Sequence, residues 1–234
     1  MLIVKTGTVR TALTDADGDF EDWFARALGC PVRVCSVFEG DELPSPDAAR
    51  GAVVTGSAAM VSDREAWIGR TAEWLRAAVE AGVPVLGVCF GHQLLAHAFG
   101  GRVGPNPRGR EIGTVGLTLT DSAAADPLLA GLPERIDVHA THLESVLELP
   151  PGAELLASSA LDPHQAFRLP GRRAWGLQFH PELTAAITRG YIEAKRRDMQ
   201  REGLDPDRLL AEVRETRWGG DILARFARLA DNIG

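Results

Sequence analysis

The sequence predicts an α/β fold with a doubly wound, mostly parallel sheet of the flavodoxin-like or Rossmann-like kind. Over the first hundred residues, short apolar runs alternate with amphipathic stretches, the order expected of parallel strands joined by helices. The runs Val53-Val54 and Val83-Pro84-Val85-Leu86 are apolar without alternation, as expected for strands covered by helices on both faces. We expect strands near 2–6, 32–38, 51–55 and 83–88, and helices near 18–28, 63–81 and 91–99.

The clearest of these helices is the one near 63–81. It opens with Ser62-Asp63-Arg64-Glu65, whose spacing predicts a capping box. Five residues then recur on one helical face: Trp67, Thr71, Trp74, Leu75 and Ala78. We expect this face to pack on the sheet.

The second half of the chain has shorter runs separated by Gly and Pro, which predicts added antiparallel strands on the same core. The expected strands are 114–120, 136–140, 153–158, 165–169 and 174–180. Beyond residue 183 the pattern becomes helical, with Asp205-Pro206 as a start and Gly219-Gly220 as a break. The last helix should carry Ile222, Phe226, Leu229 and Ile233 on one face. We expect residues 1–234 to form a single catalytic domain.

Composition excludes several classes of function. The 234 residues carry a formal net charge of −7, which disfavours a sequence-independent nucleic-acid binder and favours a small-molecule substrate. There is no apolar run long enough to span a membrane and no basic leader at the N-terminus, so we expect a cytoplasmic protein. Three cysteines are too few for a disulfide framework, and Cys30 and Cys35 are expected to be buried packing residues.

Cys89 has the surroundings of an activated nucleophile. A strand ends in Gly87-Val88-Cys89-Phe90-Gly91 and a helix follows, which is the layout of a nucleophile elbow. Small residues two before and two after the cysteine relieve crowding in such a turn. The N-terminus of the helix should favour thiolate over thiol, and the N–H of Phe90 should face an oxyanion. Glycines also occur at ordinary strand ends, so a structural cysteine remains an alternative on this motif alone.

A base for this thiol is offered by Phe179-His180-Pro181-Glu182. His180 ends an apolar run, and in an extended segment residues two apart point to the same side, so Glu182 can lie beside the imidazole. A carboxylate there would fix the tautomer and stabilise the imidazolium. Taken alone, the pattern also fits a strand-end histidine with a surface glutamate.

Together these motifs resemble those of the class I, or triad, glutamine amidotransferases. The resemblance rests on Gly-Val-Cys-Phe-Gly-His-Gln at 87–93 and Phe-His-Pro-Glu at 179–182, in the family's order, and the expected fold agrees over most of the chain. It implies Cys89 as nucleophile, His180 as base and acid, and Glu182 as the residue that orients His180.

The resemblance also implies a set of binding residues. Val54-Thr55-Gly56-Ser57 resembles the family's glycine-bearing loop, which makes the Gly56 N–H the second oxyanion donor beside Phe90. Gln93 matches the residue that contacts the substrate glutamine. The segment Thr141-His142-Leu143-Glu144 resembles the family's Ser/Asn-His-x-Asp, with Thr141 and Glu144 as departures, and implies that it holds the amino-acid end of glutamine.

The implied reaction is hydrolysis of the glutamine γ-carboxamide through a γ-glutamyl thioester on Cys89, with release of ammonia. No cofactor is required. We expect no metal site, since His92 and His97 do not share a helical face and His139 and His142 are three apart in a strand-like segment. His92 should pack at the helix start, and His164 should lie in a loop.

The fate of the ammonia stays open. The chain has no phosphate-binding glycine loop, so any acceptor-activating synthase would be a separate partner. Gly109-Arg110-Glu111-Ile112-Gly113 supports a likeness to free-standing domains related to the glutaminase half of GMP synthase. Three alternatives remain: a γ-glutamyl peptidase or hydrolase, a cysteine α/β-hydrolase in which the acid usually precedes the histidine, and a catalytically silent binding module.

Overall fold

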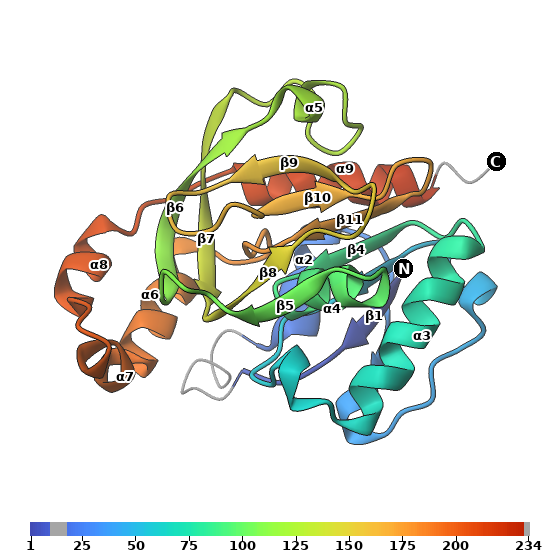
Figure 1. The fold of residues 1–234 in the computed structure, drawn as a ribbon, viewed down its shortest axis with the longest axis horizontal. Helices are drawn as coiled ribbons and strands as arrows, with labels where there is room; N and C mark the ends of the chain where they lie inside the picture. The colour runs from blue at the N-terminus through green and yellow to red at the C-terminus, as the bar shows by residue number, and fades with distance from the viewer. Residues whose placement is uncertain (10–17, 232–234) are drawn as a thin grey trace.

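The computed structural model describes residues 1–9 and 18–231, and its centre is a nine-stranded mixed sheet (Figure 1). Five strands are parallel, in the order β2 (Arg33–Ser36), β1 (Leu2–Lys5), β3 (Ala52–Val54), β4 (Val85–Val88) and β11 (Ala174–Leu177). Four antiparallel strands continue from β11, in the order β10 (Ala166–Arg168), β9 (Glu154–Ser158), β6 (Glu111–Leu119) and β7 (Arg135–His142). The predicted fold class is confirmed.

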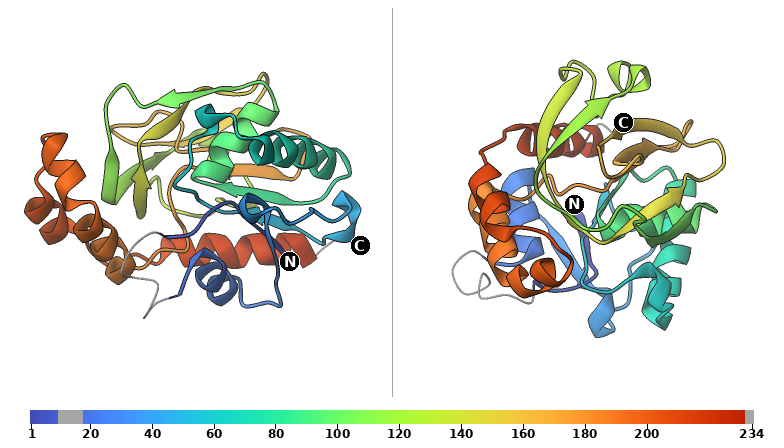
Figure 2. Two further views of the ribbon diagram at one scale, coloured as in Figure 1. Left: turned by 90° about the horizontal axis from the view of Figure 1, so that it is seen from below. Right: turned by 60° about the vertical axis from the view of Figure 1, so that its left-hand side comes forward.

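Helices cover both faces of the parallel half. Figure 2 shows α2 (Phe20–Leu28) and α9 (Trp218–Asp231) on one side and α3 (Ala66–Glu80) and α4 (Phe90–Ala98) on the other. Each side has its own apolar core, in which Phe24 and Phe226 are fully buried on the first and Leu75 and Leu94 on the second. Burial on both faces explains why strands β3 and β4 read as continuous apolar runs.

Several shorter elements complete the fold. A two-stranded antiparallel ribbon, β5 (Arg102–Pro105) with β8 (Glu144–Glu148), packs on α4. The other short helices are η1 (Val37–Glu39), η2 (Pro46–Ala48), η3 (Val61–Asp63), α5 (Asp121–Ala124), α6 (Ala185–Ala194), α7 (Arg196–Arg201) and α8 (Pro206–Glu212). Pro206 is the first residue of α8, and the Asp205 side chain accepts hydrogen bonds from two of its backbone amides, as expected from the sequence. In the described part of the chain, no helix has the length and apolar character needed to cross a membrane.

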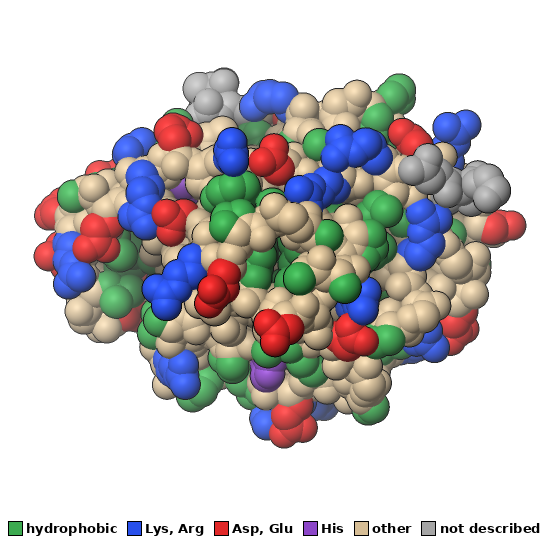
Figure 3. Space-filling model, turned by 90° about the horizontal axis from the view of Figure 1, so that it is seen from above, with side chains coloured by type: hydrophobic (Ala, Val, Ile, Leu, Met, Phe, Trp, Pro, Cys, Tyr) green, Lys and Arg blue, Asp and Glu red, His purple; other side chains and the backbone are tan. Residues whose placement is uncertain are grey.

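Charges of both signs are mixed over the surface. On the face drawn in Figure 3, Lys and Arg side chains are interspersed with Asp and Glu side chains. Some exposed charges are paired, such as Arg102 with Glu148 at 2.6 Å and Arg208 with Glu212 at 2.8 Å. Intermixed charges of this kind cancel at a distance, so that face presents mixed polarity rather than one extended field of a single sign.

Two sequence predictions about helix ends are wrong. Helix α3 begins at Ala66 and has no side-chain cap, because residues 61–63 form a 3₁₀ turn and Arg64 adopts a φ of 55° that interrupts the helix. The predicted buried face of α3 is nonetheless confirmed over all five of its residues. Gly219-Gly220 is not a break, since both residues lie in the first turn of α9, whose Ile222 and Phe226 are buried; Ile233 lies outside the described residues.

Strand boundaries near the predicted site also differ from expectation. Strand β11 ends at Leu177, so His180 follows the strand rather than ending it, and the Leu183 N–H closes a turn on the His180 carbonyl at 3.4 Å. The ribbon β5–β8 was not predicted, because Gly104 and Pro105 weaken the strand pattern in the sequence, although proline is tolerated in a strand that pairs on one side only. Cys35 is buried as predicted, whereas Cys30 is only half-buried at the edge of the core.

Close backbone packing holds the turn between β4 and α4. A Cβ on Gly91 would overlap the Val54 carbonyl, and a Cβ on Gly87 would overlap the Gly91 carbonyl. The Gly91 N–H donates to the Thr55 carbonyl at 3.2 Å, which joins α4 to the loop after β3. The position of α4 therefore depends on the absence of a side chain at residues 87 and 91.

We predict that Gly91→Ala lowers the free energy of unfolding by about 1–3 kcal/mol or more, since the new methyl group must displace backbone. Gly69→Ala is the matched control, because Gly69 lies in α3 with open space around its Cα and helix propensity favours alanine there by up to about 1 kcal/mol. Urea unfolding of both variants checks this. Equal stability of the two variants would contradict the packing argument.

Candidate active site

Cys89 lies at the tight turn from β4 into α4. Its φ of 52° and ψ of −103° are outside the regions that non-glycine residues favour, and such a conformation typically costs about 1–3 kcal/mol. Two backbone hydrogen bonds hold it: the Cys89 N–H donates to the Leu177 carbonyl at 2.8 Å, and the Gln93 N–H donates to the Cys89 carbonyl at 3.1 Å. The observed backbone forms the sharp strand-to-helix turn that Gly87 and Gly91 predicted.

Gly56 and Phe90, the expected oxyanion donors, lie on either side of this turn. Phe90 is the first residue of α4, and no hydrogen bond within the described residues takes up its N–H or that of Gly56. The Gly56 loop is fixed from behind, since the Thr6 hydroxyl donates to the Gly56 carbonyl at 3.0 Å. A Cβ on Gly56 would lie 2.9 Å from His180 Cε1, so the glycine allows the imidazole to approach.

The structure brings His180 and Glu182 together, as the sequence predicted, but through a turn rather than through strand alternation. Glu182 Oε1 accepts a hydrogen bond from His180 Nδ1 at 2.7 Å, and both side chains are buried. Phe20 stacks on the imidazole with 6.3 Å between ring centroids and 11° between planes. His180 Nε2 has no hydrogen-bond partner among the described residues, which leaves it available on the side of Cys89.

Neighbouring strands explain why these residues meet. Strands β4 and β11 are parallel neighbours that pair Val88 with Leu177, so the segments that follow them leave the same edge of the sheet. Strand β7 is the last strand in the sheet order, far from β4 and β11. It nevertheless contacts the segment that follows β11, because the His180 N–H donates to the His139 carbonyl at 2.8 Å. The site thus lies at the carboxyl ends of parallel strands, as expected for a fold of this class.

The charges of Cys89 and His180 stabilise each other. Burial alone would raise the pKa of the Cys89 thiol, but the neighbouring His180 outweighs burial and lowers the pKa below its ordinary value of 9.0. Burial alone would lower the pKa of His180, but the charges of Glu182 and Cys89 raise it above 6.5. These opposite shifts favour a thiolate and imidazolium pair near neutral pH.

The segment Thr141-His142-Leu143 lies beside Cys89 at the end of β7. The Cys89 thiol is 3.9 Å from the Thr141 carbonyl, and the Thr141 hydroxyl is buried without a partner among the described residues. The Gln93 amide group donates to the Glu144 carbonyl at 2.8 Å and to Gln178 Oε1 at 3.0 Å. Gln93 and residues 141–144 therefore form one wall of a cavity beside Cys89.

Neither ring nitrogen of His142 is available to bind a ligand in the cavity, because both already form hydrogen bonds. Nδ1 is 3.0 Å from the Glu144 carbonyl and Nε2 is 2.9 Å from Glu111 Oε2. A carbonyl and a carboxylate both accept hydrogen bonds, so these partners favour a ring that donates from both nitrogens, which is an imidazolium. Burial opposes this charge, but the hydrogen bond and charge of Glu111 outweigh it and raise the His142 pKa. This charge also contributes to lowering the pKa of Cys89.

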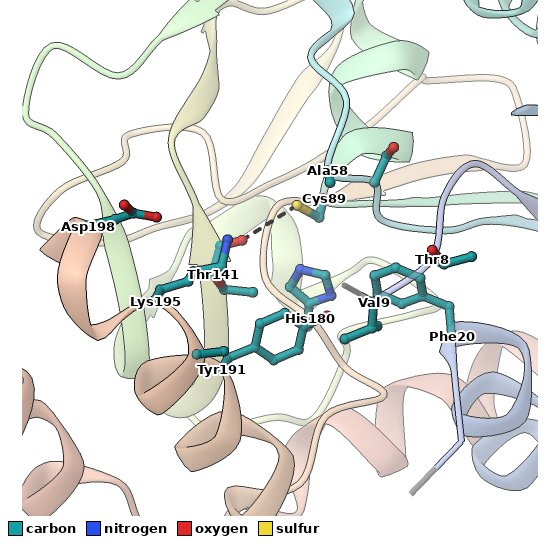
Figure 4. A pocket seen from close by; sticks show the side chains of 12 residues that line it. Thr8, Val9, Phe20, Ala58, Cys89, Thr141, His180, Tyr191, Lys195 and Asp198 are labelled. Atoms are coloured by element: carbon teal, nitrogen blue, oxygen red, sulfur yellow. Dashed lines mark hydrogen bonds between the residues drawn. The ribbon is translucent and has the colours of Figure 1, made fainter. Parts of the chain in front are cut away.

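Two chambers adjoin Cys89. The smaller, about 150 Å³, includes Gln93, Phe90, Arg110 and residues 141–144 in its wall. The larger, about 250 Å³, includes His180 and is drawn in Figure 4. Ser57, Ala58, Thr141 and Lys195 line both chambers.

Sequence reasoning missed most of the wall of the larger chamber. Phe20, Tyr191, Lys195 and Asp198 lie in helices or helix ends whose pattern reads as ordinary packing or surface. The only sequence signal was indirect. Arg110 belongs to the quoted Gly-Arg-Glu-Ile-Gly segment and forms a two-pronged ion pair with Glu202 of the α7 end, at 2.7 Å for each hydrogen bond, which places α7 over the site.

The remaining histidines have structural surroundings. His92 is fully buried at the start of α4 and packs on Phe167 at 5.0 Å between ring centroids, whereas His97 is exposed. His164 Nδ1 lies 2.6 Å from the Val146 carbonyl in a loop. Among the described residues, no group of three or more His, Cys, Asp or Glu side chains is arranged to hold a metal ion.

The lowered pKa of Cys89 predicts selective alkylation. At pH 7, iodoacetamide should modify Cys89 faster than Cys30, and faster than Cys35, whose pKa is raised by burial. His180→Ala removes the charge that lowers the Cys89 pKa, so the alkylation rate of Cys89 should fall at least about tenfold at pH 7 and its pH midpoint should move upward. Peptide mapping by mass spectrometry measures each site. Rates for Cys89 that match those of Cys35 in both proteins would contradict an activated thiolate.

The chain is similar in sequence to glutamine-hydrolyzing enzymes. The chain is 42% identical over 134 residues to a glutamine-hydrolyzing GMP synthase of Thermomicrobium roseum, a match that covers 57% of this chain and 23% of that protein. It is 40% identical over 119 residues to one of the subunits of the glutamine-hydrolyzing GMP synthase of Thermococcus kodakarensis, covering 49% of this chain and 61% of the relative. The matched part thus spans about a quarter of the former protein and under two thirds of the latter.

Solved structures share the fold. A glutamine amidotransferase from Thermotoga maritima superposes with a TM-score of 0.76 at 20% identity, covering 99% of each chain. A putative GMP synthase subunit from Thermoplasma acidophilum superposes with a TM-score of 0.66 at 22% identity, covering 99% of this chain and 94% of the other. The sequence model described as "Glutamine amidotransferase class-I" matches residues 16–195, which is more than half of the sequence. The chain belongs to the class-I glutamine amidotransferase family.

Proposed function

We propose that this protein hydrolyses the γ-carboxamide of glutamine through a γ-glutamyl thioester on Cys89, in a single catalytic domain. The observation that carries the proposal is the arrangement of His180: its Nδ1 is bonded to Glu182, and its Nε2, which has no hydrogen-bond partner among the described residues, is on the side of the positive-φ cysteine. A nucleophile, a base and a group that orients the base are the parts that acyl transfer by a thiol requires.

The first half of the reaction forms the thioester. The Cys89 thiolate attacks the γ-carbonyl carbon, and the N–H groups of Phe90 and Gly56 receive the negative charge that develops on oxygen, each typically worth about 3 kcal/mol of the barrier. His180 gives its proton to the leaving nitrogen, the C–N bond breaks, and ammonia departs.

The second half regenerates the enzyme. Water attacks the thioester carbon while His180 takes its proton, the C–S bond breaks, and glutamate leaves with Cys89 again a thiolate. Glu182 stays ionised throughout and holds the imidazole in the tautomer that presents Nε2. No step uses a cofactor.

We assign the glutamyl end of the substrate to the smaller chamber, next to Gln93 and Thr141, His142 and Leu143. This chamber includes Phe90, whose N–H has no hydrogen-bond partner in the described part of the chain, and its wall carries backbone groups that suit an amino acid. His142 is fixed by Glu111 and acts there as a buried positive charge.

Ammonia would pass to a separate synthase in a cytoplasmic complex. Two observations support this arrangement: the Thermococcus kodakarensis relative is described as one subunit of a synthase, and this chain has no phosphate-binding glycine loop in its sequence. In our proposal, this chain binds neither a membrane nor a nucleic acid.

The proposal predicts that Cys89→Ala abolishes release of glutamate from glutamine, γ-glutamyl peptides and γ-glutamyl amines, because no thioester can form. The free energy of unfolding should change by no more than about 1 kcal/mol, since one sulfur atom is removed from a site that keeps its backbone. Cys30→Ala serves as the control and should retain turnover. Chromatographic assay of glutamate, with ammonia or amine measured in parallel, decides the outcome. Turnover by Cys89→Ala, or no turnover of any of these compounds by the wild-type protein, would refute the proposed function.

A further inference from the structure

The larger chamber next to His180 holds more than ammonia. In the reaction above, His180 protonates the leaving nitrogen, so the leaving group must lie on the imidazole side of Cys89. This side is the chamber of about 250 Å³, several times the roughly 30 Å³ that a water-sized molecule such as ammonia fills. The site therefore has room for a substituent on the γ-nitrogen.

The wall of this chamber is apolar at one end and carries two charged side chains, Lys195 and Asp198, at the other. Val9, Phe20 and Tyr191 supply an apolar surface around His180. Lys195, at the junction of α6 and α7, extends its side chain toward Thr141 in Figure 4. A small organic group could pack on the apolar surface while a negative charge meets the ammonium group.

Lys195 is notable because the other charges around it are already paired. Arg110 pairs with Glu202 at 2.7 Å, and Asp198 pairs with Arg201 at 2.9 Å. Lys195 has no ion pair or hydrogen bond from its side chain to any residue in the ranges 1–9 and 18–231. Its partial burial, followed by the charge of Arg110, lowers its pKa, and the charges of Cys89, Asp198 and Glu202 act in the opposite direction without outweighing them.

We infer that the site also accepts γ-glutamyl amides whose leaving amine carries a carboxylate, such as γ-glutamyl amino acids or peptides, and that Lys195 binds this carboxylate. The inference rests on the proposed function and extends it to a second class of substrate. The bonds made and broken are unchanged: water adds to the acyl carbon, and the amino acid leaves with the proton from His180. Lys195 is a specificity residue that touches the leaving group.

Two substrates of the same shape test this. γ-Glutamyl-glycine carries the carboxylate, and γ-glutamyl-glycinamide replaces it with a neutral amide. A charge-assisted hydrogen bond at a partly exposed site should give the wild-type protein about a tenfold higher kcat/KM for γ-glutamyl-glycine. Because each protein is measured with both compounds, a loss of folded protein cancels in the ratio.

Variants at neighbouring positions isolate the charge. Lys195→Gln should reduce the ratio to about one, and Lys195→Arg should keep most of it, since the positive charge remains. Arg197→Gln removes an exposed positive charge from α7, two residues after Lys195, without altering either chamber, so it should leave the ratio as in the wild-type protein. Release of glutamate is measured for all four proteins, with glutamine as a third substrate.

Each outcome is informative. A tenfold ratio that is lost only in Lys195→Gln supports the inference. A wild-type ratio near one overturns the inference. If glutamine is still hydrolysed in that case, the proposed function stands. An equal loss by Lys195→Gln on all three substrates also overturns the inference, because Lys195 would then bind the glutamyl end. If none of the three compounds is cleaved, the proposed function is refuted, and the inference with it.

Discussion

The strained backbone at Cys89 is the constraint on which the rest of the site depends. A non-glycine residue at φ 52° persists only when its surroundings hold it, and here the neighbours are the two strands that flank β4. Strand β11 accepts the Cys89 N–H at Leu177, and the loop after β3 accepts the Gly91 N–H at Thr55. The same contacts that hold the cysteine therefore also place the loops that carry His180 and Gly56.

Charge pairing organises the layer above the sheet. Glu182 holds His180, and Glu111 holds His142, so two buried imidazoles each have a carboxylate partner near a single thiol. Buried charges of this kind persist only when they are paired and hydrogen-bonded. Arg110, the residue before Glu111, pairs with Glu202 and fixes α7 over the cavity. Two consecutive residues at the start of β6, Arg110 and Glu111, thus position both the wall around His142 and the wall around Lys195.

The sequence was informative where a local rule decides the structure. The elbow follows from Gly87 and Gly91, because only small residues fit at those backbone contacts, and apolar runs predicted four of the five parallel strands. The fifth, β11, was expected among the antiparallel strands, but it pairs in parallel with β4. His180 and Glu182 were found from their spacing, although a turn rather than an extended strand brings them together.

Long-range contacts were beyond sequence reasoning. The predicted start of α3 was wrong because Arg64 adopts a left-handed conformation that no local pattern indicates. Ser62, which was expected to belong to a capping box, donates instead to Glu144 at 2.6 Å, 82 residues away. Lys195 was missed for the same reason, since its place at the cavity depends on the contact between Arg110 and Glu202 across 92 residues. Gly219 read as a break, yet its missing side chain lets α9 pack against the Pro181 carbonyl beside His180.

The central claim is that Cys89 carries the γ-glutamyl group during turnover. Rapid acid quenching of the protein during turnover of a γ-glutamyl substrate, followed by peptide mass spectrometry, tests it most directly. The account predicts a peptide containing Cys89 that is heavier by one γ-glutamyl group and that loses this mass on treatment with hydroxylamine. A quenched protein that turns over substrate but carries the added group on another residue, or on none while glutamate formation shows a burst, would contradict it.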